Sequence, residues 1–107
     1  MPADKTARKY VRVEVPKGPL VAWEHAGHRK ISSARVLALG GLFIATAEPP
    51  PSGEFIKLVL EVPGGEVRAR AIVCYSEQGK GMGIEFKAMK DDARARLNRL
   101  MKRLIGS

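Results

Sequence analysis

Residues 36–46 form an apolar run, VLALGGLFIAT, which Gly40 and Gly41 interrupt in the middle. The run is too short to span a membrane as a helix, which takes about 20 apolar residues. Its large aliphatic side chains suit the buried face of a sheet, and adjacent glycines permit either a positive φ or the close approach of another group. We therefore expect two strands that meet at a tight bend, around which the rest of the chain closes a core.

Length and charge limit the class of protein. A chain of 107 residues fits one domain, residues 1–107, and buries roughly 60–70% of its unfolded surface, enough for a core without metal or disulfides. Its 19 Lys and Arg against 11 Asp and Glu give a formal net charge of +8. This charge favours anionic partners such as a nucleotide, a nucleic acid or a membrane surface.

Cysteine content and the N-terminal sequence bear on the compartment. Cys74 is the only cysteine, and MPADKTARKY lacks the apolar core of a signal peptide. No internal disulfide can form, and no apolar stretch reaches spanning length. We therefore expect a cytoplasmic protein without membrane insertion.

Alternating apolar residues predict a series of short strands. After a polar segment, residues 1–7, that we expect to be a flexible tail, candidate strands run near residues 11–15, 20–25, 30–39 and 42–46. A hairpin follows, with apolar residues alternating from Ile56 to Val62 and from Val67 to Tyr75 around a Pro63-Gly64-Gly65 turn, and residues 83–86 form a last strand. The alternation assigns Tyr75 to the buried face of its strand.

From Asp91 the apolar period becomes that of a helix, which we expect over residues 91–105. Asp91 and Asp92 stand where the helix dipole favours carboxylates, and Gly106 ends the pattern. One face collects the apolar residues Ala93, Leu97, Leu100, Met101, Leu104 and Ile105. Short antiparallel strands followed by one amphipathic helix indicate a mainly β fold, a small closed barrel or curled sheet capped by the helix.

The order of these features resembles a PilZ domain. Arg8-Lys9-Tyr10-Val11-Arg12 precedes the first strand, VLALGGLFIAT follows the third, and a proline-glycine loop, a long hairpin, GMGIEF and a C-terminal helix complete the match from about Arg8 to Ile105. PilZ domains are six-stranded antiparallel β-barrels with a C-terminal helix, and many are bacterial receptors for the second messenger cyclic di-GMP. The resemblance implies a non-catalytic, nucleotide-binding signalling module with no other cofactor and no metal.

The family's first ligand motif, RxxxR, is present as Arg8 and Arg12. Cyclic di-GMP offers two phosphates and two guanines. The guanidinium group of arginine can pair bidentately with phosphate oxygens, stack on a purine face, and match the O6/N7 edge of guanine. Apart from the resemblance, two arginines at this spacing are also compatible with a solvated basic tail.

The family's second motif, [D/N]xSxxG, is degenerate here. Counting back from Gly41, the acidic or amide position is Val36 and the serine position is Ala38. Losing two neutral hydrogen bonds of about 0.5–1.5 kcal/mol each weakens affinity roughly 5- to 150-fold. Gly40 and Gly41 either approach the ligand or provide a bend that closes the barrel.

Other functions remain open at this stage. Some family members lack the ligand motif and act by protein contact, so a degenerate interaction module in a signalling or motility pathway, monomeric or weakly dimeric, is the alternative. General nucleic-acid binding ranks last because few aromatic residues are present to stack bases. Trp23 suits a core or rim position, His25, His28 and Cys74 lack a metal-ligand spacing, and Glu66 and Glu85 lack a nucleophile and base, so we expect no enzyme.

Overall fold

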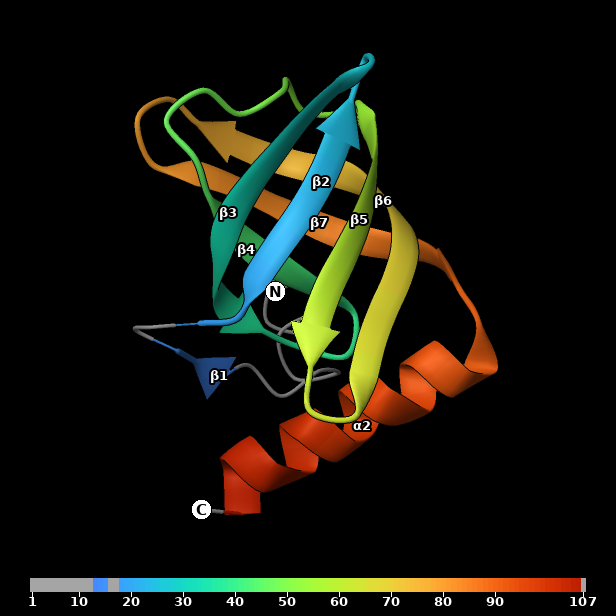
Figure 1. The fold of residues 1–107 in the computed structure, drawn as a ribbon. Helices are drawn as coiled ribbons and strands as arrows, with labels where there is room; N and C mark the ends of the chain where they lie inside the picture. The colour runs from blue at the N-terminus through green and yellow to red at the C-terminus, as the bar shows by residue number, and fades with distance from the viewer. Residues whose placement is uncertain (1–12, 16–17, 107) are drawn as a thin grey trace, which may run out of the picture.

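The computed structural model describes residues 13–15 and 18–106 (Figure 1). The expected flexible tail, residues 1–7, and both Arg8 and Arg12 lie outside this part. The described chain forms seven strands and one helix: β1 Val13–Glu14, β2 Leu20–His25, β3 His28–Leu37, β4 Gly41–Ala45, β5 Phe55–Val62, β6 Gly65–Glu77, β7 Gly81–Met89 and α2 Asp91–Gly106.

Six of the strands close into an antiparallel barrel. The hydrogen-bonded order runs β3-β2-β5-β6-β7-β4, and a further pairing between β3 and β4 completes the ring. The two-residue strand β1 adds to β3 outside this ring, with Val13 opposite Leu37 and Glu14 opposite Val36. The predicted fold class, a six-stranded barrel with a C-terminal helix, is confirmed.

Irregularities in strand pairing let long strands turn around the barrel. The register shifts between Ala34 and Val36 in β3, and between Val73 and Tyr75 in β6. An extra residue in one strand bends that strand and increases its twist. Because side chains alternate between the two faces of a strand, each shift also changes which later residues point into the core.

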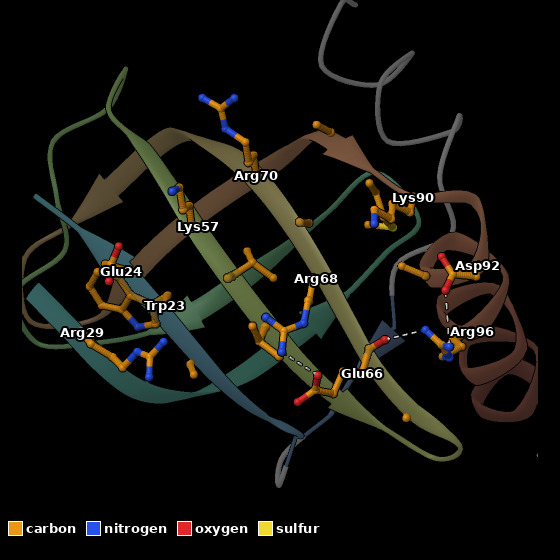
Figure 2. Close-up of a pocket in the computed structure, with 18 residues that line it drawn as sticks. Trp23, Glu24, Arg29, Lys57, Glu66, Arg68, Arg70, Lys90, Asp92 and Arg96 are labelled. Atoms are coloured by element: carbon orange, nitrogen blue, oxygen red, sulfur yellow. Dashed lines mark hydrogen bonds and ion pairs between the residues drawn. The ribbon is translucent and has the colours of Figure 1, made fainter. Parts of the chain in front are cut away.

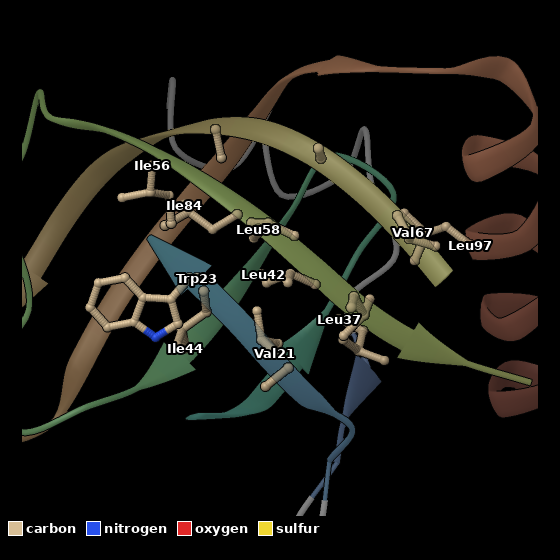
Figure 3. Close-up of a cluster of buried hydrophobic side chains, with 14 of the residues drawn as sticks. Val21, Trp23, Leu37, Leu42, Ile44, Ile56, Leu58, Val67, Ile84 and Leu97 are labelled. Carbon is tan, nitrogen blue, oxygen red and sulfur yellow. The ribbon is translucent and has the colours of Figure 1, made fainter. Parts of the chain in front are cut away.

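The core fills the barrel and the interface with α2. Figure 3 shows side chains from all six barrel strands and the helix meeting inside it. The inward rows of neighbouring strands oppose one another in register, as Leu37 opposes Leu42 and Val73 opposes Ile84. The largest fully buried side chains are Leu37, Ile44, Leu60, Met82, Leu97, Val21, Val67 and Val73.

Helix α2 packs with most of its predicted apolar face. Ala93, Leu97 and Met101 are buried, but Ile105, which the sequence pattern places on the same face, is 54% exposed. At 3.6 residues per turn, Ile105 lies about 80° around the helix from Leu97, at the margin of the stripe. Among the described residues, no helix combines the length and apolarity needed to cross a membrane.

Candidate ligand-binding face

The degenerate motif lies at the turn between β3 and β4. Val36 is the next-to-last residue of β3, Ala38 follows the strand, and Gly41 begins β4. The Ala38 N–H donates to the Gly41 carbonyl at 3.0 Å, and the Gly40 carbonyl accepts from the Phe86 N–H at 2.9 Å. The turn is therefore held both within itself and against β7, and it brings the three motif positions together.

The requirement for glycine at position 41 comes from the packing of β4 on β7. Gly41 lies opposite Glu85, and a Cβ at Gly41 would overlap the carbonyl oxygen of Ile84. Neither Gly40 nor Gly41 has a positive φ. Of the two interpretations of the glycine pair, the geometry supports a barrel-closing contact between two backbones.

An outward-facing row of side chains begins at Val36. Across neighbouring strands, Val36 lies opposite Phe43, Phe43 opposite Gly83, and Gly83 opposite Tyr75. Residues directly opposite one another in antiparallel strands share a face of the sheet. We call this surface, formed by Val36, Phe43, Gly83 and Tyr75, the aromatic face.

The two rings of the aromatic face lie close to the sheet. Their centroids are 6.2 Å apart with planes tilted by 33°, and Tyr75 is 44% exposed. A side chain at Gly83 would overlap the Tyr75 ring, and one at Gly81 would press on Phe43. Glycine in β7 thus makes room for both rings, which offer apolar faces suited to stacking on planar ligands.

The sequence pattern assigned Tyr75 to the buried face, and this was wrong. The register shift between Val73 and Tyr75 inserts Cys74 as an extra residue, so the alternation is interrupted there. Val73 is 1% exposed, whereas Tyr75 points outward. Sequence reasoning missed Phe43 and Tyr75 as candidate site residues because their proximity arises from inter-strand register, which the linear pattern does not show.

The described chain begins beside the same turn. Val13 pairs with Leu37, Glu14 pairs with Val36, and the Val15 N–H donates to the Arg35 carbonyl at 2.8 Å. Arg12 is bonded directly to Val13, although Arg12 and Arg8 themselves lie outside the described residues. The attachment point of the arginine motif is therefore next to the positions of the second motif.

A carboxylate lies near this turn and is paired. The Glu85 Oε1 is 2.7 Å from the Lys87 Nζ, and Glu85 raises the pKa of Lys87. Burial, followed by the charge of Glu85, raises the pKa of the Cys74 thiol, while Lys87 lowers it. The ion pair reduces the repulsion that Glu85 alone would exert on an anionic ligand.

The remaining candidates of the sequence have structural roles. Trp23 is 3% exposed and its Nε1 donates to the Ser32 Oγ at 3.0 Å, so it is a core aromatic. His25 contacts Glu54 at 3.0 Å, and the described residues contain no group of three metal-ligating side chains.

The two glutamates considered as an acid pair are far apart. Glu85 lies opposite Ile72, six residues along β6 from Glu66, which is about 20 Å in a strand. The Glu66 Oε1 instead accepts a hydrogen bond from Arg68 at 3.1 Å. They therefore cannot work as an acid and base on one bond.

Comparison with known proteins agrees with this architecture. A family model described as the PilZ domain matches residues 6–103. The Bacillus subtilis inhibitor of motility (MotI/DgrA) superposes with a TM-score of 0.76 at 19% identity, over 94% of this chain and 52% of that chain. The K. pneumonia MrkH–c-di-GMP complex gives a TM-score of 0.75 at 19% identity, over 92% and 51%.

A further structure of MrkH, described as a c-di-GMP-dependent transcription regulatory factor, gives a TM-score of 0.75 at 17% identity, over 94% of this chain and 52% of that chain. The chain thus spans about half the length of the solved structures that it matches. A search of curated proteins finds no match to the sequence.

Proposed function

The chain belongs to the PilZ domain family, and from that premise we propose that it is a non-catalytic receptor for cyclic di-GMP that binds the nucleotide beside the β3–β4 turn. The observation that carries the proposal is the pairing of β1 with β3, Val13 opposite Leu37. Arg12 is the residue before Val13, and five residues of extended chain place Arg8 at most about 18 Å from Val13. Both motifs are therefore attached to the same end of the barrel, beside the β3–β4 turn.

The residues at this end of the barrel suit the chemistry of cyclic di-GMP. Arg8 and Arg12 supply guanidinium groups for phosphates and guanine edges. Phe43 and Tyr75 add ring faces, and stacking of a base on an aromatic side chain contributes about 1–3 kcal/mol. Gly41 contributes indirectly, because it allows the turn to pack on β7.

The affinity is expected to be reduced relative to a complete motif. The side chains of Val36 and Ala38 carry no hydrogen-bond donor or acceptor, so neither can hydrogen-bond the nucleotide. Binding then depends on the two arginines and on stacking. We place the receptor in the cytoplasm, as a monomer or weak homodimer that acts on a protein partner in a signalling or motility pathway.

Calorimetric titration with cyclic di-GMP tests the proposal. We expect measurable binding by the native chain and its loss in Arg8→Ala/Arg12→Ala. The matched control, Arg94→Ala/Arg99→Ala, removes two arginines that are exposed on α2 and should bind like the native chain. No heat from the native chain at high micromolar ligand, or equal loss in both double variants, would contradict the proposal.

The second candidate is a degenerate PilZ domain that binds no nucleotide and acts by protein contact. The apolar side chains at positions 36 and 38 favour it, because Val36 is an ordinary outward-facing strand residue and Ala38 an ordinary buried turn residue in this structure. A native chain that gives no heat with cyclic di-GMP but retains its fold would support this candidate.

A further inference from the structure

A second surface of the barrel, away from the aromatic face, forms a basic groove. It has a volume of about 880 Å³ and is bounded by β2, β3, β5, β6, the end of β7 and the first turns of α2 (Figure 2). Six Lys and Arg and three Asp and Glu line it, which gives the lining a net charge of +3. The groove shares β3, β6 and β7 with the aromatic face but lies along other parts of these strands. Arg29 is seven residues from Val36 in β3, and Arg70 is five residues from Tyr75 in β6, about 17–23 Å along a strand, so this groove is separate from the proposed nucleotide site.

A row of charged residues crosses the strands of the groove. Arg29 lies opposite Glu24, Glu24 opposite Lys57, and Lys57 opposite Arg70. Like charges directly opposite one another destabilise an antiparallel pair. Neither Lys57 nor Arg70 has an ion-pair or hydrogen-bond partner among the described residues. The Lys57–Arg70 pair is thus a repulsive contact that a bound anion would relieve.

An apolar row runs parallel to the charged row. Ile31 lies opposite Ala22, Ala22 opposite Val59, and Val59 opposite Arg68. Ile31 is 69% exposed, and Leu20, two residues from Ala22 on the same face of β2, is 52% exposed. Lys57 and Arg70, which have no partner among the described residues, therefore lie next to exposed aliphatic side chains. This arrangement suits a partner surface on which a stripe of acidic residues runs beside a stripe of apolar residues.

The closed sheet determines how such a partner can bind. β2, β5 and β6 have hydrogen-bonded neighbours on both sides, so they offer no edge to which a strand could be added. A helix laid across them advances about 5.4 Å per turn, close to the strand spacing of about 4.8 Å. Acidic residues one turn apart would therefore reach Lys57 on β5 and Arg70 on β6, the two neighbouring cations of the charged row.

We propose that the basic groove docks an acidic amphipathic helix of a partner protein, with its carboxylates over Lys57 and Arg70 and its apolar stripe over Ile31 and Val59. Nucleic acid is the less suitable polyanion, because the aromatic side chain in the lining, Trp23, is 3% exposed and cannot stack on bases. A bound nucleic acid would also leave the exposed aliphatic side chains of the apolar row without an apolar contact.

The test uses a fluorescent synthetic helical peptide that carries Glu at i, i+4 and i+7 and Leu on the adjacent stripe. We expect saturable binding by fluorescence anisotropy at low salt, and about tenfold or greater weakening in Lys57→Glu/Arg70→Glu. The control variant, Arg94→Glu/Arg99→Glu, changes net charge equally outside the groove and should bind within about threefold of the native chain. Lys57→Gln/Arg70→Gln removes the repulsive pair without adding charge and should weaken binding in the same direction.

Four outcomes overturn the proposal. The first is that the peptide does not bind, and the second is that the control variant weakens binding equally. The third is equal affinity for a peptide of the same composition whose Glu residues are scattered around the helix. The fourth is displacement of the peptide by a short DNA duplex whose own binding is lost in Lys57→Gln/Arg70→Gln. Because the peptide assay contains no cyclic di-GMP, its result is independent of nucleotide binding at the other face.

Discussion

Restoring the second motif should tighten nucleotide binding while lowering the stability of the barrel. In Val36→Asp/Ala38→Ser, the two new polar side chains can each hydrogen-bond cyclic di-GMP, at about 0.5–1.5 kcal/mol apiece. The combined gain of about 1–3 kcal/mol corresponds to roughly 5- to 150-fold tighter binding. The gain requires that position 36 face the ligand, as its place opposite Phe43 on the aromatic face predicts.

The same substitution carries a cost that the structure specifies. Position 36 lies opposite Glu14 in the β1–β3 pair, so an aspartate there sets like charges directly opposite one another, at about 0.2–1 kcal/mol. Aspartate is also disfavoured in strands, within a scale of about 1 kcal/mol. A total loss of about 1–2 kcal/mol lowers the melting temperature by about 4–8 °C per kcal/mol in a domain of this size.

A matched variant separates the two effects. Val36→Asn/Ala38→Ser also satisfies the family motif but adds no charge opposite Glu14, so it should tighten binding with a smaller fall in melting temperature. Calorimetry with cyclic di-GMP and thermal unfolding without ligand measure the two quantities. Unchanged or weaker affinity in both variants, while they remain folded at the assay temperature, would refute the placement of the motif on this face.

Three further predictions concern the barrel and its thiol. Gly41→Ala should lower stability by about 1–3 kcal/mol in chemical denaturation, because its Cβ would overlap the Ile84 carbonyl, and a loss below about 0.5 kcal/mol would contradict that contact. Leu97→Ala should cost about 2–5 kcal/mol in the same assay, whereas Ile105→Ala, at a 54% exposed position, should cost less than about 0.5 kcal/mol; similar losses would mean that α2 packs differently. Cys74 should alkylate slowly at neutral pH and faster as pH rises, since its thiol pKa is raised, and Glu85→Gln should speed alkylation by lowering that pKa. An alkylation rate independent of Glu85 would contradict the contribution of the Glu85 charge to the raised pKa of Cys74.

Local signals in the sequence were sufficient to predict most of the elements. The span of β2, Leu20–His25, matches the expected position, and the turn of the long hairpin falls at Pro63-Gly64, with Gly65 already the first residue of β6. Strand alternation and turn residues act between neighbours in sequence, so they can be recognised without knowing the fold. Boundaries that depend on partners were less accurate: β3 ends at Leu37 and not at residue 39, because the chain must turn there to pair with β4.

The candidate site was only partly predictable for the same reason. The positions 36, 38 and 41 are close in sequence, and one turn brings them together. Phe43 and Tyr75 are 32 residues apart and meet only through Gly83 of a third strand. No single-strand pattern shows such a contact, and the extra residue Cys74 reversed the face that alternation assigned to Tyr75.

The retained glycine of the second motif carries little weight as an indicator of nucleotide binding. Gly41 is required by the approach of β4 to the Ile84 carbonyl, so a barrel of this shape would keep it whether or not a ligand binds. Val36 faces outward from β3, and a change of its polarity does not alter the inward core, which is Leu37 and its neighbours. The fold alone therefore requires glycine at position 41 and accepts an apolar residue at position 36, which is the combination in this sequence. It follows that substitutions of Arg8 and Arg12 and of positions 36 and 38 discriminate between a nucleotide receptor and an interaction module, whereas a substitution of Gly41 would report on the stability of the barrel.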